Sequence, residues 1–309
     1  MQAARVHQYG GPEVITLEDI ARPSPGDGEV LVRVAAAGVG PWDTWVRTGR
    51  SVLRQPLPLT LGSDLSGEVV EVGAGVHGFA PGQHVFGVTN ELFIGAYAEY
   101  AVARAAMIAT KPAAIGHVAA ASVPVVAVTA LQMLVDLAGV RPGQRVLVLG
   151  AGGNVGGYAV QLARLARAHV TGADFTAGAM YASRIGADEV IDMTAAPIER
   201  ASAIDVVIDT VGGDLAVRAL ATLSPGGVLV SSVAQLAPSR TDVRAHYLIV
   251  DVTSAALERI ARELQAGSLV TNVGTVLPLG NARRAHDMLE GRVPHLPGKL
   301  VLAVDSATR

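Results

Sequence analysis

A glycine-rich turn near the middle of the chain constrains the fold more than any other feature. The segment RVLVLGAGGNVGG (145–157) begins with an apolar run typical of a strand buried on both faces. Six of the eight residues from Gly150 to Gly157 are glycine or alanine, and the apolar residues that follow recur at helical spacing. This order predicts a phosphate-binding site, because a helix N-terminus presents unpaired N–H groups and a partial positive charge.

The spacing of the glycines departs from the usual dinucleotide fingerprint, G-x-G-x-x-G. Gly150, Gly152 and Gly156 stand as G-x-G-x-x-x-G, so the match is imperfect. Asp174 lies 18 residues beyond Gly156, where a carboxylate at the end of the next strand would hold the ribose hydroxyls of NAD. The alternative is an ordinary α/β turn followed by a surface aspartate. The order of strand, turn, helix and acidic residue favours the interpretation as a nucleotide-binding site.

Composition excludes several classes of protein. The 309 residues are 50% hydrophobic and 17% charged, which is typical of a well-buried α/β enzyme of one large or two ordinary domains. The chain has no cysteine, so disulfides, thiolate zinc sites and a cysteine nucleophile are excluded. The net charge is −3, and the sequence has no basic stripe of the kind that indicates nucleic-acid binding. We expect a cytoplasmic protein with neither nucleic acid nor a membrane as partner, since polar residues and Pro124 interrupt the longest apolar stretch (118–140).

The first third of the chain is predicted to be rich in β structure. Short β-branched or alternating runs are separated by turn sequences such as PSPGDG and PGQ. This spacing is typical of a compact antiparallel barrel or sandwich. The predicted strands are 3–7, 15–18, 29–37, 67–72, 84–88 and 98–102.

From about residue 115, strands and helices alternate, which predicts a doubly wound parallel sheet. The predicted strands are 145–149, 169–172, 189–192, 205–209, 227–233 and 247–252, and the predicted helices are 118–140, 156–168, 177–185 and 215–223. Two further helices (255–265 and 281–290) and a last strand (299–304) are expected to return to the first domain. We therefore expect one domain formed by 1–118 and 255–309, and a nucleotide-binding domain formed by 119–254.

Motifs along nearly the whole chain resemble the medium-chain dehydrogenase/reductase superfamily, and its zinc-independent quinone oxidoreductase branch in particular. They include LPLTLGSDLSGEVVEVGAGV (57–76), GAYAEYAV (95–102), LGAGGNVGGYAVQLA (149–163), DVVIDTVGG (205–213), LSPGGVLVS (223–231) and PGKLVL (297–302). The resemblance implies a GroES-like β-barrel catalytic domain, a Rossmann domain, an active site in the cleft between them, and a homodimer. It also implies hydride transfer from NAD(P)H to a small quinone or another α,β-unsaturated carbonyl.

Two other functions remain open. An enoyl-thioester reductase would need a basic patch for a phosphopantetheine carrier, and the sequence offers no compelling one. A non-catalytic NAD(P)H-binding redox sensor would bind the cofactor without turnover.

The residues that bind zinc in related dehydrogenases are replaced in this chain. Zinc-dependent members carry a Cys after the segment that corresponds to 36–40 and a Gly-His-Glu where this chain has Gly62-Ser63-Asp64. The eight histidines show no ligand spacing. We therefore predict no metal site, which disfavours alcohol oxidation through a zinc-bound alkoxide.

The expected substrate pocket also departs from the family pattern. Where the family often has Asn and Tyr in G-V-N-P-x-D-x-Y, this chain has Gly40 and Trp45, while Asp43 persists. An indole donates a hydrogen bond but is no acid near neutral pH, so Trp45 would stack on a flat substrate rather than protonate it. Trp45 and Asp43 are the candidate catalytic residues; the alternatives are a core role for Trp42 and Trp45 and a structural cap for Asp43.

The resemblance leaves the choice of cofactor open. Quinone oxidoreductases of this branch usually use NADPH, yet Asp174 and Phe175 follow the second strand here and no Lys or Arg occurs before Arg184. An ionised carboxylate repels a 2′-phosphate and binds a free 2′-hydroxyl, so NADH is favoured. The full set of predicted cofactor-binding residues is Thr129, Gly150, Gly152, Gly153, Asn154, Val155, Gly156, Asp174, Phe175, Thr210, Val211 and Ser231.

Overall fold

The computed structural model describes residues 1–238 and 240–304. Contacts within the chain divide it into two compact units. The first unit comprises Met1–Val125, Val252–Gly267 and the segment from Thr271 onward. The second comprises Val126–Asp251 and Ser268–Val270. Each unit has its own hydrophobic core.

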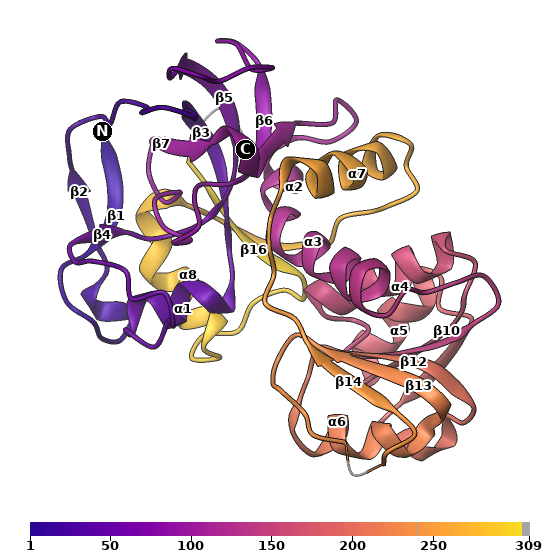
Figure 1. Cartoon of the computed structure of the whole chain (residues 1–309). Coiled ribbons are helices and arrows are strands. Elements are labelled where there is room, and N and C mark those ends of the chain that lie inside the picture. Colours follow the sequence, from indigo (N-terminus) through magenta and orange to yellow (C-terminus); the bar gives the residue numbers. More distant parts are fainter. Residues whose placement is uncertain (239, 305–309) are drawn as a thin grey trace. The chain divides into compact units, whose positions relative to one another are not determined.

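The first unit is built on β structure, mostly antiparallel, as the spacing of its strands predicted (Figure 1). Its larger sheet has the order β15-β16-β3-β5-β6-β8, and β7 also pairs with β3. Its smaller sheet has the order β2-β1-β4. The strands are β1 (Gln2–Val6), β2 (Thr16–Asp19), β3 (Glu29–Val39), β4 (Leu59–Thr60), β5 (Asp64–Val72), β6 (His84–Val88), β7 (Tyr100–Arg104), β8 (Ile108–Thr110), β15 (Val273–Pro278) and β16 (Lys299–Ala303).

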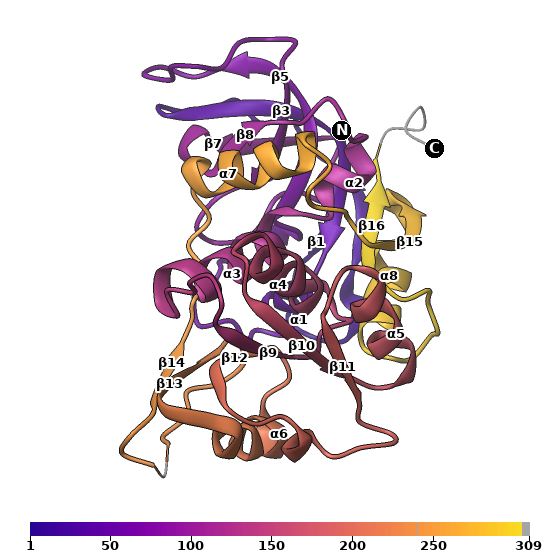
Figure 2. The ribbon, with the colours of Figure 1, turned by 90° about the vertical axis from the view of Figure 1, so that its right-hand side faces the viewer.

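The C-terminal segment belongs to this first unit. Figure 2 shows β15 and β16 side by side; β16 pairs antiparallel with β3, so the last strand extends the sheet that the first third of the chain begins. The helices of the unit are α1 (Pro41–Arg47), α2 (His117–Ala121), α7 (Ser254–Gln265) and α8 (Ala282–Leu289). The side chain of Thr253 caps α7 by accepting a hydrogen bond from the N–H of Ala256.

The second unit has one six-stranded sheet of order β11-β10-β9-β12-β13-β14. Every strand pair in it is parallel, which confirms the predicted doubly wound α/β fold. Its strands are β9 (Arg145–Leu149), β10 (His169–Asp174), β11 (Glu189–Asp192), β12 (Ile204–Asp209), β13 (Leu223–Ser231) and β14 (Arg244–Tyr247). Its helices are α4 (Asn154–Leu165), α5 (Thr176–Arg184) and α6 (Gly213–Ala219), and α3 (Pro124–Gln132) begins just before it.

The structure departs from the sequence predictions at several places, and three of these departures have a clear physical reason. The single helix expected over 118–140 is interrupted at Ser122 and Val123, because the residue before Pro124 is disfavoured in helical conformation. The strand expected over 247–252 lies at Arg244–Tyr247 instead and shares only Tyr247 with the prediction, since an apolar run alone does not separate a paired strand from an extended segment. Helix α1 was not predicted, and its start at Pro41 places proline in the first turn, where the missing N–H costs nothing.

No helix in the described ranges, 1–238 and 240–304, combines the length and the apolarity needed to span a bilayer.

Candidate functional site

The glycine turn after β9 requires glycine for two separate reasons. Gly150 has φ of +74°, a left-handed conformation that other residues rarely adopt. A Cβ at Gly152 would lie 2.3 Å from Cα of Gly178, and a Cβ at Gly156 would lie 2.0 Å from the carbonyl oxygen of Gly150. Because these neighbours are backbone atoms, they have no rotamer to change. The spacing G-x-G-x-x-x-G is therefore what this turn needs to pack against α4 and α5.

Helix α4 begins at the turn without a side-chain cap, since its N-cap residue is Gly153. The first N–H groups of the helix, from Asn154, Val155 and Gly156, have no acceptor within the helix. A Cβ at Gly153 would have only the carbonyl oxygen of Gly150 within 4 Å, at 3.2 Å, so this side of the turn is uncrowded. Unpaired donors, the helix dipole and open space together fit a pyrophosphate group.

Asp174 ends β10 next to the glycine turn. Its Oδ2 accepts a hydrogen bond from the N–H of Gly152 at 2.8 Å, and its Oδ1 accepts one from the N–H of Phe175 at 2.7 Å. Each carboxylate oxygen keeps a second lone pair, which a ribose hydroxyl could use. The Phe175 side chain beside it is 58% exposed. The carboxylate is thus fixed by backbone donors at the edge of the phosphate cradle.

The ends of β12 and β13 carry the other predicted contact residues of the sheet. Asp209 is buried and accepts hydrogen bonds from the hydroxyl of Ser231 at 2.6 Å and from the N–H of Val211 at 3.0 Å. The hydroxyl of Thr210 donates to the carbonyl of Leu149 at 2.7 Å. Both hydroxyl protons therefore bond within the protein, whereas the Val211 side chain is exposed. Cofactor contacts at these positions stay predictions.

Thr129 lies in α3, and its side chain is buried. This part of α3 belongs to the second unit, which also contains the parallel sheet. Its predicted place beside the nicotinamide stays a prediction.

Helix α1 positions the candidate catalytic residues of the first unit. Asp43 in its first turn is fully buried, and its Oδ2 accepts hydrogen bonds from the N–H of Gly40 at 2.8 Å and from the hydroxyl of Tyr97 at 2.9 Å. Within the described part of the chain, its Oδ1 is buried without a partner. Burial raises the pKa of Asp43 to about 7, against the opposing effects of the Gly40 hydrogen bond and of the Lys299 charge. Asp43 thus caps α1, and its carboxyl is protonated in mildly acidic solution.

A buried ion pair lies beside Asp43. The Nζ of Lys299 is 3.0 Å from Oδ2 of Asp64 and 4.2 Å from the ring centroid of Trp42, close enough for a cation–π contact. The indole N–H of Trp42 donates to the hydroxyl of Ser63 at 3.0 Å. Burial raises the pKa of Asp64, and the charge of Lys299 opposes the shift. Trp42 is thus partly buried and held by polar contacts.

The resemblance to medium-chain dehydrogenases places Ser63 and Asp64 where the zinc-dependent members have His and Glu. In this chain Ser63 is bonded to Trp42 and Asp64 to Lys299. Over residues 1–238 and 240–304, no group of three or more His, Cys, Asp or Glu side chains is placed to hold a metal ion.

Trp45 lies one helical turn after Pro41 on α1, with its side chain 52% exposed. It is therefore not a core residue of the barrel. An exposed indole on a short, anchored helix offers a flat apolar surface and a single donor.

A second buried cluster ties α1 to α8. The guanidinium of Arg47, which is fully buried, donates from Nε to Nδ1 of His286 at 3.2 Å and from Nη1 to the carbonyl of Gly10 at 2.6 Å. Its Nη2 also contacts Glu290. Burial and then the Arg47 charge lower the pKa of His286 to about 3, so this imidazole stays neutral at physiological pH.

Four of these residues were not predicted from the sequence: Arg47, Tyr97, His286 and Lys299. A usable signal existed for Lys299, since a lone lysine at the start of the apolar run KLVLA needs a buried partner. For Tyr97 and His286 there was none, because each meets its partners only through the tertiary fold.

Comparison with known proteins agrees with this geometry. Residues 26–113 match the family model described as "Alcohol dehydrogenase GroES-like domain", and residues 185–302 match the one described as "Zinc-binding dehydrogenase". A quinone oxidoreductase from Sus scrofa is 34% identical over 98% of this chain and 97% of its own.

Two solved structures with the same fold carry different cofactor names. An NAD-dependent alcohol dehydrogenase matches with a TM-score of 0.89 at 33% identity, covering 99% of this chain and 100% of its own. A mycobacterial protein solved in complex with NADPH matches with a TM-score of 0.84 at 27% identity, covering 98% of this chain and 100% of its own.

Proposed function

Because the chain belongs to the quinone oxidoreductase branch of the medium-chain dehydrogenase/reductase superfamily, we propose that it is a zinc-independent reductase which transfers hydride from NAD(P)H to a quinone or another α,β-unsaturated carbonyl. The observation that carries this proposal is the glycine cradle at the N-terminus of α4, with Asp174 fixed beside it. When bound, the dihydronicotinamide supplies the hydride. The protein supplies binding, orientation and exclusion of water.

The cradle and Asp174 support NADH as the preferred form of the cofactor. The backbone donors of α4 would hold the pyrophosphate, and the free lone pairs of Asp174 would accept ribose hydroxyls. A 2′-phosphate would meet the negative charge of Asp174. Phe175 would cover one face of the adenine.

Zinc independence is supported by the chemistry around Trp42. The side chains at the two ligand positions are engaged with the Trp42 indole and the Lys299 ammonium rather than converging on an open position. A catalytic zinc needs three protein ligands and a fourth open position. A conjugated carbonyl delocalises the charge that hydride addition creates, so its reduction needs no Lewis acid.

On the substrate side we propose separate roles for Trp45 and Asp43. Trp45 would stack on a flat conjugated ring and orient it, since it has no proton to give. Asp43 would keep α1 in place through Gly40 and Tyr97. Because the Asp43 carboxyl is fully buried, direct proton transfer to the substrate would require it to become accessible.

We also propose a homodimer formed through the edge of the parallel sheet. Among the described residues β14 pairs only with β13, and Ile249 just after it is 75% exposed. An unpaired edge with exposed apolar side chains favours association with a second copy. A cytoplasmic location stays a prediction.

The test is the oxidation of NADH and NADPH, followed by absorbance, with chelator-treated protein. A panel of benzoquinone, naphthoquinone and cyclohexenone is compared with primary alcohols offered together with NAD⁺. We expect NADH consumption with the quinones or the enone, unaffected by the chelator, and little alcohol oxidation. Tight NADH binding without turnover on any acceptor would refute the reductase and favour a sensor. Chelator-sensitive alcohol oxidation would refute zinc independence.

A further inference from the structure

Five exposed apolar or aromatic side chains lie on segments of the first unit that hydrogen bonds join around one buried glutamine. Gln55 is 3% exposed, although Val52 nearby is 86% exposed. Solvent-facing apolar residues are common singly, but a contiguous group marks a binding surface more often than chance exposure does. We call this surface the Gln55 face: Tyr9, Trp45, Val52, Leu53 and Leu92.

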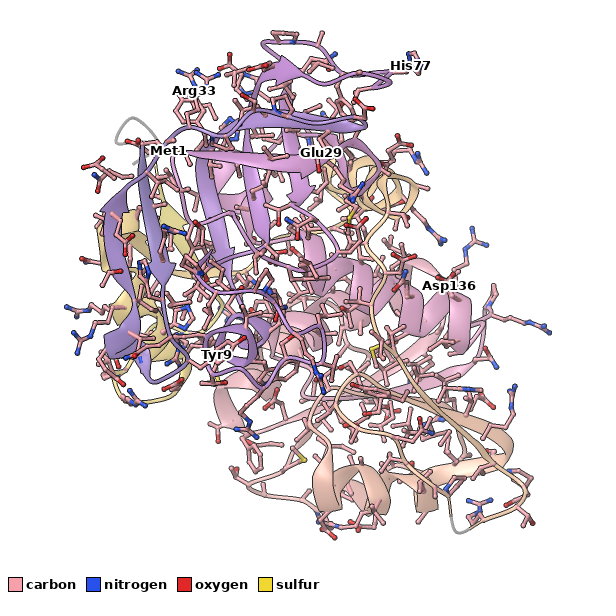
Figure 3. The ribbon with its side chains drawn as sticks, turned by 60° about the vertical axis from the view of Figure 1, so that its left-hand side comes forward. Met1, Tyr9, Glu29, Arg33, His77 and Asp136 are labelled. Atoms are coloured by element: carbon pink, nitrogen blue, oxygen red, sulfur yellow. The ribbon has the colours of Figure 1, made fainter. Side chains whose placement is uncertain are left out.

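Gln55 fastens three separate segments of the chain together. Its side-chain Nε2 donates to the hydroxyl of Ser51 at 3.0 Å and to the carbonyl of Leu92 at 2.8 Å. The main-chain carbonyl of Gln55 accepts a hydrogen bond from the hydroxyl of Tyr9 at 2.9 Å. Figure 3 labels Tyr9, which follows β1 in the chain. The apolar side chains are thus held on a bonded frame of loops.

The Gln55 face is continuous with α1. The carbonyl of Trp45 accepts hydrogen bonds from the N–H of Arg50 at 2.8 Å and from the N–H of Ser51 at 3.0 Å. The loop that carries Val52 and Leu53 is therefore bonded to the main chain of the residue proposed to stack on the substrate ring. Trp45 and the exposed side chains of Val52 and Leu53 thus belong to one hydrogen-bonded segment.

Charge on the surrounding surface does not indicate an acidic ligand pocket or a cation site. Glu91, next to Leu92, pairs with Arg104 at 2.8 Å. Arg50 and Arg54 are exposed and flank the pair Val52 and Leu53, while the segment 44–60 contains no acidic residue.

We propose that the Gln55 face binds an extended apolar substituent of the substrate, so that the enzyme prefers quinones or enones carrying an alkyl or isoprenoid chain. This inference rests on the proposed function, because Trp45 is taken as the residue that orients the ring. The chain would cover Val52, Leu53 and Leu92 and remove apolar surface from water on both partners. If these contacts form equally in the ground and transition states, they lower KM rather than raise kcat.

The test compares two acceptors that share one ring, an unsubstituted benzoquinone and a decyl-substituted benzoquinone. For the wild-type protein we expect kcat/KM to be at least about tenfold higher with the decyl compound, mainly through KM, which corresponds to about 1.4 kcal/mol. In Val52→Ser/Leu53→Ser we expect this ratio to fall by most of that factor. Leu92→Ser, on a different loop, should lower the ratio by a smaller amount.

Matched controls separate this effect from general changes. Val276→Ser/Leu296→Ser removes two exposed apolar side chains elsewhere in the first unit and should leave the ratio unaltered. Arg50→Ser/Arg54→Ser should also retain most of it, whereas a collapse there would show recognition of charge and overturn the proposal. Equal kcat/KM for the two acceptors in the wild type, or equal losses with both acceptors in the Val52 and Leu53 variant, would overturn it as well.

A binding measurement keeps this inference separable from the proposed function. The affinity for decylhydroquinone, followed by tryptophan fluorescence, should weaken in Val52→Ser/Leu53→Ser and not in the control pair. If no quinone is turned over but this difference appears, the proposed reaction fails and the apolar site stands. If quinones are turned over without any preference for the chain, the site fails alone. A shift in oligomeric state in Val52→Ser/Leu53→Ser would identify a second copy of the chain as the occupant and refute the proposal.

Discussion

The glycine turn of the second unit and the buried polar cluster beside α1 in the first unit are built in opposite ways. The turn uses backbone atoms from a few consecutive residues, and only Asp174 comes from the next strand. The cluster uses side chains from four distant segments: Asp43, Asp64, Tyr97 and Lys299. This backbone cradle is specified by sterics and has no room for a side chain at Gly152 or Gly156. A side-chain cluster is specified by charge and burial, so its behaviour depends on pH.

The largest effect is expected at the turn, in Gly156→Ala. The added Cβ would meet the carbonyl oxygen of Gly150 at 2.0 Å, so the start of α4 must move away from the glycine turn that precedes it. We expect NADH affinity to fall at least about a hundredfold, and unfolding stability to fall by about 1–3 kcal/mol as in other overpacked sites. Fluorescence titration and urea unfolding measure the two quantities.

Gly157→Ala is the matched control in the same helix. Its Cβ would approach only a ring carbon of Tyr181 at 3.3 Å and a methyl of Ile185 at 3.6 Å, besides a more distant backbone oxygen. Both side chains can adjust, so little loss is expected. Equal effects of the two substitutions would show that close packing at Gly156 does not define the cradle.

A smaller effect, dependent on pH, is expected in the cluster. Asp43 has an ordinary pKa near 4 when unfolded and about 7 when folded, because burial disfavours its charge. The native protein therefore binds more protons in this window, and the contribution of Asp43 to stability falls as pH rises from about 4 to 7. Asp43→Asn should lose this dependence. As pH rises through this window, the stability of Asp43→Asn should therefore improve relative to wild type, by up to roughly 1.4 kcal/mol per pH unit where the dependence is steepest.

The stability of Asp43→Asn must be compared with that of wild type at each pH, because the titration of His286 changes stability with pH in the opposite direction. Its pKa is lowered to about 3, so the contribution of His286 to stability is present above about pH 6.5 and is lost as pH falls toward 3. The exposed Asp19→Asn is the control. A difference between Asp43→Asn and wild type that stays constant between pH 4 and 8 would contradict a proton on buried Asp43.

The sequence predicted most of the fold for the same reason that it predicted the turn. The strand of residues 84–88 was predicted with both ends correct, and the apolar runs before Gly150 and Thr210 gave β9 and β12. These signals are local: they consist of periodicity and turn residues. The strand β14 was predicted three residues too late because pairing at a sheet edge depends on the neighbouring strand. The break in the helix before Pro124 was missed although proline marks it.

The side-chain clusters could not be predicted in the same way. Asp43 was recognised as a candidate, but its partner Tyr97 is 54 positions away and is brought to it by the fold. Arg47 and His286 are 239 positions apart. The exposure of Trp45 and Val52 was equally hidden, because an apolar residue in a sequence looks the same whether it faces the core or the solvent.

The central claim is that the glycine turn and Asp174 hold a nicotinamide dinucleotide with a free 2′-hydroxyl. It is tested most directly by the dissociation constants of NADH and NADPH for wild type, Asp174→Ser and Asp192→Ser. Asp192 is the matched control because it is the register partner of Asp174 on β11 and likewise accepts backbone N–H groups. We expect tighter binding of NADH by the wild type, loss of about tenfold in that preference in Asp174→Ser, and its retention in Asp192→Ser. Preference of the wild type for NADPH, unchanged in Asp174→Ser, would contradict the claim.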